Sequence, residues 1–208
     1  MKKIALYLFL FVLFALMYRF EQIQQIDNYA VKGMEGLRSE AFTKFFLVMS
    51  EIGSIKVELP LLFFVSIILL FYGRILSIIF LWFTLNSVRF LNFELKEFFH
   101  RERPSFDAVI NAAHYSFPSG HSMNSAAVYG FICYLLIELT GTNERCKKWL
   151  IGMTVLLIGL IGISRIYLGV HYLFDVLAGL SAGMAWLLIL IKVYEGINSK
   201  IIDKTRLT

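Results

Sequence analysis

The chain has 208 residues, of which 58% are hydrophobic and only 17% are charged. Soluble domains carry charge on roughly a quarter of their residues, so this composition excludes an ordinary soluble domain and predicts a polytopic helical membrane protein. The net charge is +5. Because the cations flank apolar segments and form no basic stripe with interleaved aromatic residues, we expect the lipid bilayer and an anionic lipid as partners, and no nucleic acid.

Six apolar segments reach or approach the roughly 20 residues that a helix needs to cross a bilayer. The first follows Met1-Lys2-Lys3. Bulky and charged residues follow it in place of a small-x-small cleavage site, so we interpret it as an uncleaved span and not as a signal peptide. The six expected spans cover residues 4–17, 59–72, 75–91, 119–139, 149–163 and 171–193.

Residues 26–48, between the first two spans, repeat apolar residues at intervals of three and four. That spacing is typical of an amphipathic helix, so we expect one or two short helices lying in the membrane interface. Packing of the same helices against the spans is the alternative. The expected fold class is all-α, with six transmembrane helices, short interfacial helices between spans one and two, and a single membrane-embedded domain over residues 1–208.

Gly179 and Gly183 lie four residues apart in the last span. Small residues at this spacing allow two helices to approach closely in a membrane. We expect them to serve packing inside the bundle and not a contact between two copies of the chain, although the sequence leaves the oligomeric state open.

An even number of spans places both termini on the same side of the membrane. Basic residues concentrate in cytoplasmic loops, and here they occur near both termini and in the loop at residues 142–148, so we expect cytoplasmic termini. The opposite side carries nearly as many cations, but several belong to polar motifs, where function explains them. We therefore expect a multi-pass protein of the cell membrane whose motifs lie on the extracytoplasmic face.

Three short polar segments stand out in this apolar chain. They are Lys96 with Arg103-Pro104, then Pro118-Ser119-Gly120-His121, and then Ser164-Arg165 with His171 and Asp175. The first follows span three, the second opens span four and the third joins spans five and six, so an in-and-out path puts all of them on one face. Charges are costly near a bilayer, and a cluster of them indicates a functional site.

The second segment is typical of the start of a helix. Ser119 is suited to be the N-cap, and Gly120 lets the backbone approach an anion closely. The free N–H groups and the positive end of the helix dipole also favour an anion there, with His121 in reach of it. An ordinary capped helix is the alternative interpretation.

His171 and Asp175 are four residues apart, which places them on one face of a helix. A carboxylate bound to one ring nitrogen orients the imidazole and leaves the other nitrogen as a nucleophile, and Arg165 can clamp phosphate oxygens. A structural polar pair is the alternative. Considered without the other two motifs, Lys96 and Arg103 are typical of interfacial cations whose charged ends reach water.

Taken together, these groups match the needs of phosphoryl transfer. That reaction requires cations and N–H donors for the equatorial oxygens, an in-line nucleophile and a proton source for the leaving group. The chain has no acidic cluster of the kind that Mg²⁺ prefers, and its two cysteines lack metal-ligand spacing. We therefore expect neither a metal nor another cofactor.

These residues resemble the three-part signature of the type 2 phosphatidic acid phosphatase superfamily, and the six-span layout resembles its membrane branch. The resemblance implies a metal-independent mechanism in which His171 attacks phosphorus and forms a phosphohistidine. Asp175 is then expected to orient His171, and His121 to protonate the leaving oxygen and later activate water. The residues expected to hold the phosphoryl oxygens are Lys96, Arg103, Ser119, Gly120 and Arg165.

The resemblance also implies a membrane lipid phosphatase whose substrate is an anionic phospholipid or a polyprenyl phosphate. We rank phosphatidylglycerophosphate first, with undecaprenyl diphosphate or phosphatidic acid as alternatives. Transfer of the phosphate to an acceptor lipid is a second reaction class. A transporter is a third class, for which Asn86 and Ser125 are weak mid-span candidates. Arg101, His100 and His114 match no position of the signature and receive no role.

Overall fold

The computed structural model describes residues 1–105 and 107–206, with side chains described as far as residue 201. All regular structure in the part described is helical, which confirms the expected all-α class. The helices are α1 (Lys2–Met17), α2 (Glu21–Gly36), α3 (Glu40–Ile52), α4 (Ile55–Phe71), α5 (Ile75–Phe99), α6 (Gly120–Thr140), α7 (Glu144–Tyr167) and α8 (Leu173–Arg206).

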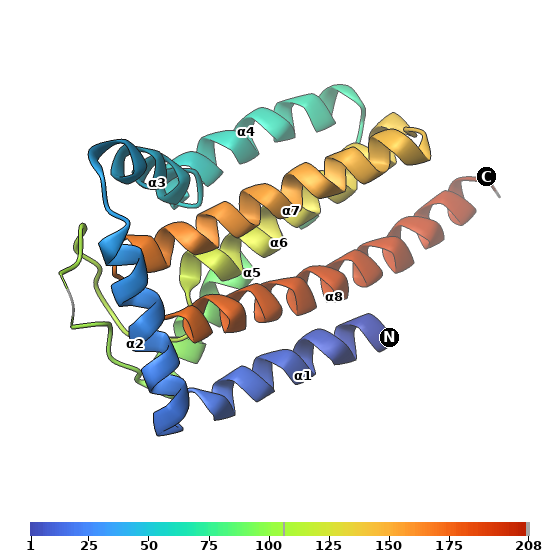
Figure 1. Ribbon diagram of the computed structural model, residues 1–208. Helices are drawn as coiled ribbons and strands as arrows, with labels where there is room; N and C mark the ends of the chain where they lie inside the picture. The colour runs from blue at the N-terminus through green and yellow to red at the C-terminus, as the bar shows by residue number, and fades with distance from the viewer. Residues whose placement is uncertain (106, 207–208) are drawn as a thin grey trace.

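The long helices lie side by side with α6 among α5, α7 and α8 (Figure 1). Both termini lie at one end of this bundle, together with the connections from α4 to α5 and from α6 to α7. At the other end lie α2, α3, the segment between α5 and α6, and the turn between α7 and α8. The segments that carry the three motifs therefore meet at the end away from the termini.

Four helices, α5 to α8, are long and apolar enough to cross a membrane on their own. α1 and α4 have 16 and 17 residues. Each passes the same length and hydropathy test together with its neighbour, across a bend of 97° between α1 and α2 and of 51° between α3 and α4. The described chain thus has four to six candidate spans, and the count of six and the interfacial position of α2 and α3 remain predictions.

Three expected boundaries near the motifs were wrong. α5 continues to Phe99, past the expected end of span three at residue 91, because residues 92–99 include no Gly or Pro to break the helix. Lys96 therefore lies on this helix and not after its end. α7 continues to Tyr167, so Arg165 lies in its last turn. α8 begins only at Leu173, so His171 precedes the helix that carries Asp175.

Gly179 and Gly183 face α6 at very close range. A Cβ on Gly179 would lie 2.6 Å from the carbonyl oxygen of Ser119, and one on Gly183 would lie 2.3 Å from that of Met123. No side chain fits in either place, so the two backbones touch, and the expectation that this pair serves internal packing is confirmed. The contact also brings the first turn of α6 beside the start of α8.

Candidate active site

The segment between α5 and α6 folds back over the end of the bundle. His100 ends α5 in the left-handed conformation, with φ of 49° and ψ of 31°. The chain reverses there, and the Arg103 side chain donates from Nε to the carbonyl of His114 at 2.9 Å and from Nη2 to that of Ala113 at 2.8 Å. Its Nη1 donates to the carbonyl of Val170 at 2.7 Å. Arg103 therefore ties this segment to the turn between α7 and α8.

A cavity of about 310 Å³ opens at this end of the bundle. Six of the eight residues selected from the sequence line it, and they come from all three motifs: Lys96, Arg103, Gly120, His121, Arg165 and His171. The other two, Ser119 and Asp175, are fully buried. The structure thus brings the three motifs together at one place, although their positions in the sequence span about 80 residues.

Lys96, Arg103 and Arg165 bring three cations to the cavity, and none of them forms an ion pair with a carboxylate in the described chain. Lys96 donates to the carbonyl of Tyr115 and Arg165 donates to the hydroxyl of Ser50. Their residues are only 9% and 3% exposed. Buried charge without a counter-ion is costly, so this cavity is suited to receive an anion.

His171 stands between these cations and Asp175. Its Nε2 lies 3.2 Å from Nη1 of Arg103, and its Nδ1 lies 3.5 Å from Oδ2 of Asp175 and 3.3 Å from the hydroxyl of Ser116. Burial, and then the positive charges of the cavity cations, hold the pKa of His171 well below its usual value. The imidazole is therefore neutral near pH 7, with one nitrogen toward a carboxylate and the other toward the cations.

The Asp175 carboxylate is held by groups that match no position of the expected signature. Its Oδ2 accepts hydrogen bonds from the Ser116 hydroxyl at 2.5 Å and from the Tyr172 N–H at 2.8 Å. Its Oδ1 accepts one from Nη1 of Arg101 at 2.5 Å. Sequence reasoning missed Ser116 and gave Arg101 no role. Their contacts depend on how the segment after α5 folds back, and no local pattern signals that.

The first turn of α6 forms another wall of the cavity. Ser119 is its N-cap residue, as expected, but the side chain does not cap the helix and instead accepts from the Ser122 hydroxyl at 3.0 Å. A Cβ on Gly120 would lie 2.8 Å from Oδ1 of Asn92 on α5. The packing of α6 against α5 is therefore a reason for glycine at this position that does not depend on an anion. Gly120 and His121 line the cavity, which places the positive end of the helix dipole beside it.

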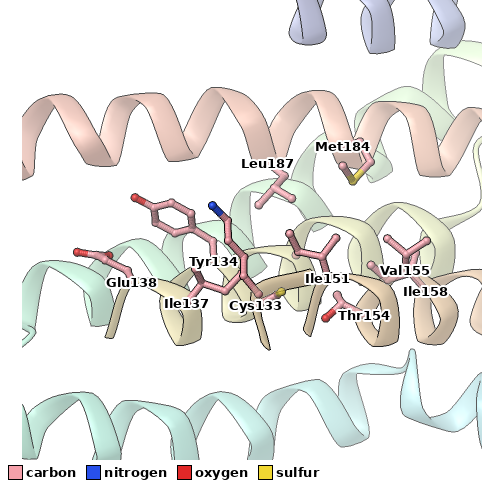
Figure 2. Close-up of a pocket in the computed structure, with 12 residues that line it drawn as sticks. Cys133, Tyr134, Ile137, Glu138, Ile151, Thr154, Val155, Ile158, Met184 and Leu187 are labelled. Atoms are coloured by element: carbon pink, nitrogen blue, oxygen red, sulfur yellow. The ribbon is translucent and has the colours of Figure 1, made fainter. Parts of the chain in front are cut away.

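A larger cavity, of about 460 Å³, lies elsewhere in the bundle. Figure 2 shows side chains from α6, α7 and α8 around it, among them Cys133, Ile151 and Leu187. Its lining is predominantly apolar, and it lies along the later turns of α6, towards the end with the termini. It contains none of the motif residues, so size alone would have selected the wrong site.

The fold and the site define an integral-membrane protein with a cavity that three cations and His171 line. The family model of the PAP2 superfamily matches residues 74–199, which include all three motifs. Phosphatidylglycerophosphatase B of Bacillus subtilis (strain 168) is 32% identical over 200 residues, or 96% of each chain. The chain belongs to the PAP2 superfamily and is an enzyme of the lipid phosphate phosphatase class.

Two solved structures share this architecture. The crystal structure of a transmembrane PAP2 type phosphatidylglycerolphosphate phosphatase from Bacillus subtilis superimposes with a TM-score of 0.89 at 30% identity, over 97% of this chain and 98% of that one. Aquifex aeolicus LpxE superimposes with a TM-score of 0.65 at 25% identity, over 85% of this chain and 98% of that one. The likeness therefore extends well beyond the motif segments, and the protein is a multi-pass membrane protein.

Proposed function

We propose that the protein removes the terminal phosphate of phosphatidylglycerophosphate in the membrane and releases phosphatidylglycerol. The observation that supports this most is the cavity at one end of a bundle of candidate spans, where the buried Lys96 and Arg165 and the partly buried Arg103 have no carboxylate partner among the described residues. A phosphate on a lipid headgroup lies at the level of helix ends, where this cavity opens. The name of the Bacillus subtilis relative supports the choice of lipid.

The proposed reaction has two steps and one covalent intermediate. Nε2 of His171 attacks phosphorus, and as the N–P bond forms, the P–O bond to the lipid breaks and His121 protonates the leaving oxygen. A water molecule then attacks phosphorus and gives its proton to His121, and the N–P bond breaks to release phosphate. Each proton that His121 donates is thus returned within the same cycle.

The remaining residues supply orientation and charge. Asp175 accepts from Nδ1–H of His171, which leaves the lone pair on Nε2 and stabilises the positive ring of the phosphohistidine. Arg103, whose Nη1 is 3.2 Å from Nε2 of His171, is placed to hold a phosphoryl oxygen beside the nucleophile. Lys96, Arg165, the Ser119 hydroxyl and the backbone at Gly120 hold the other oxygens.

We propose that this reaction needs no metal ion and no other cofactor. The cavity cations supply the positive charge that a divalent ion supplies in other phosphoryl transfers. Within the described residues, no three His, Cys, Asp or Glu side chains lie close enough together to hold a metal.

We propose that both termini are cytoplasmic and that the cavity opens at the extracytoplasmic face. The basic residues near the termini and in the loop after α6 support this orientation. The termini and that loop share one end of the bundle, and the motif segments lie at the other (Figure 1).

The test uses purified protein in detergent with phosphatidylglycerophosphate, phosphatidic acid or undecaprenyl diphosphate, each with excess chelator, and measures released phosphate. We expect the fastest release from phosphatidylglycerophosphate and none from the His171→Ala variant. Turnover by that variant contradicts the nucleophile, and loss of wild-type turnover on adding chelator contradicts the metal-free reaction. Faster release from undecaprenyl diphosphate would replace the proposed substrate with the alternative.

A further inference from the structure

A second charged cluster lies behind His171 and Asp175, outside the three motifs. Nη1 of Arg101 is 2.5 Å from Oδ1 of Asp175, and its Nη2 is 2.6 Å from Oδ2 of Asp27 on α2. Asp27 is fully buried, and its Oδ1 accepts from the N–H of Phe174 at 3.0 Å. A single guanidinium therefore bridges two buried carboxylates, one from α2 and one from α8.

The Arg101 side chain is also held by two aromatic rings and by its own backbone. Its Cζ lies 4.7 Å from the ring centroid of Tyr18 and 4.3 Å from that of Tyr172, so two aromatic faces enclose the guanidinium. The backbone of Arg101 contributes as well, because its carbonyl accepts from the N–H of Ser116 at 2.7 Å. The Ser116 hydroxyl in turn donates to Asp175. Arg101 thus reaches the carboxylate by two routes, one direct and one through Ser116.

The charge of Asp175 depends on this arrangement. Two buried carboxylates at such range repel each other, and without a cation between them one takes up a proton. Burial alone would lower the pKa of Arg101, but Asp175 and Asp27 together raise it above its usual value. The guanidinium therefore stays charged between them. A protonated Asp175 would no longer be a full acceptor for Nδ1–H of His171.

We propose that Arg101 is a positioning residue of the active site, which holds Asp175 as an oriented carboxylate facing His171 and is itself held by Asp27. This inference rests on the roles proposed above for His171 and Asp175. Arg101 does not line the cavity of the motifs but a separate polar cavity of about 330 Å³. It therefore acts on the rate of the chemical step and not on phosphate binding, and α2 belongs to the catalytic machinery.

The pH profile distinguishes this role from a purely structural one. The charged and titratable groups that act on Asp175 are Arg101, His171, Asp27, Tyr172, Lys96 and Arg103. Removing Arg101 takes away the only one of these cations that contacts Asp175 and leaves that carboxylate without a cation between it and the buried Asp27. The acid side of the kcat profile therefore moves to higher pH in an Arg101→Ala variant.

The experiment compares Arg101→Ala and Arg101→Lys with Arg74→Ala in steady-state kinetics. Arg74 is a matched control, since it pairs with Glu138 at the other end of the bundle. We expect Arg101→Ala to lose about 100-fold in kcat with KM within about threefold of wild type. Added guanidinium ion restores part of this kcat, Arg101→Lys retains an intermediate kcat, and Arg74→Ala is unchanged with or without guanidinium.

Infrared spectroscopy gives a second measurement that does not depend on the substrate. At neutral pH we expect the difference spectrum of Arg101→Ala minus wild type to contain an added carboxylic-acid band, and this added band is lost again when Asp175→Asn is introduced. Unchanged kcat, or a loss of kcat without rescue, pH shift or new band, overturns the proposal. If wild-type protein hydrolyses no lipid phosphate, the proposed function fails, while the infrared comparison still decides the role of Arg101. If Arg101→Ala does not fold, Arg101→Gln, which also removes the positive charge, serves both measurements.

Discussion

At the scale of single residues, the cavity cations favour anion binding at the expense of stability. Lys96 is nine-tenths buried on α5 and donates to a backbone carbonyl instead of a carboxylate. Its charge therefore lacks the compensation that a folded protein usually provides. The same reasoning applies to Arg165, whose Nε has no hydrogen-bond partner among the described residues.

We therefore expect Lys96→Met to keep or raise the Tm while it lowers kcat/KM by about 100-fold, because one donor to the phosphoryl oxygens is lost. Thermal unfolding in detergent and steady-state kinetics measure the two effects. Lys44→Met is the matched control, since Lys44 is exposed on α3 and pairs with Glu40, and neither quantity should change. A marked fall in the Tm of Lys96→Met would contradict this prediction, because it would show that Lys96 stabilises the folded protein.

The depressed pKa of His171 predicts how activity depends on pH. An ordinary imidazole gains its proton near pH 6.5, but burial and the cavity cations lower the pKa of His171 well below this value. The nucleophile therefore stays neutral as the pH falls through 6.5. We expect the acid limb that belongs to His171 in the kcat/KM profile to lie below pH 6.5. Its ring resonances in NMR should titrate at the same low pH, and titration near 6.5 would contradict the burial argument.

The same shift contributes to stability, and its sign follows from proton linkage. The unfolded chain binds the His171 proton more readily than the folded one, so acid favours unfolding. The contribution is fully present above the unfolded pKa and is lost as the pH falls below 6.5 towards the folded value.

At the scale of helices, α6 and α8 touch through two glycines, and this contact brings the first turn of α6 beside the start of α8. We expect Gly183→Ala to cost about 1–3 kcal/mol of unfolding free energy, because a Cβ there overlaps the backbone of Met123. Gly159→Ala in α7 is the control, since nothing lies within 4 Å of its added Cβ, and a neutral or slightly favourable effect is expected. Equal effects of the two substitutions on thermal unfolding would contradict close packing.

At the scale of the whole molecule, the two native cysteines report the orientation. Cys146 is exposed in the first turn of α7, at the end with the termini, whereas Cys133 is buried. We expect a membrane-impermeant maleimide to label wild-type protein only after the cells are opened. The Cys146→Ser, Ser105→Cys variant moves the exposed thiol to the motif end and should be labelled in intact cells. The reverse pattern would place the cavity on the cytoplasmic face.

The sequence by itself determined the class of protein, the all-α fold and which motif residues meet at one end of the bundle. Six of the eight chosen residues line one cavity, because apolar runs impose an in-and-out path and that path brings the motif segments to the same end. Prediction from the sequence was less reliable for the positions of helix ends. The stretch around Lys96 contains polar residues but no helix breaker, so α5 continues to Phe99, past the expected end of span three at residue 91.

Only the tertiary structure decided which groups support the motif residues. Arg101 and Asp27 are 74 residues apart in the chain and meet at 2.6 Å, and nothing local to either position indicates the other. Likewise, position 120 favours glycine because a Cβ there would come too close to the side chain of Asn92 on a neighbouring helix. Hydropathy and motif spacing indicate the secondary structure and the polar residues of one segment at a time. Contacts between segments arise from how the helices pack and how the chain folds back after α5, and those are properties of the whole fold.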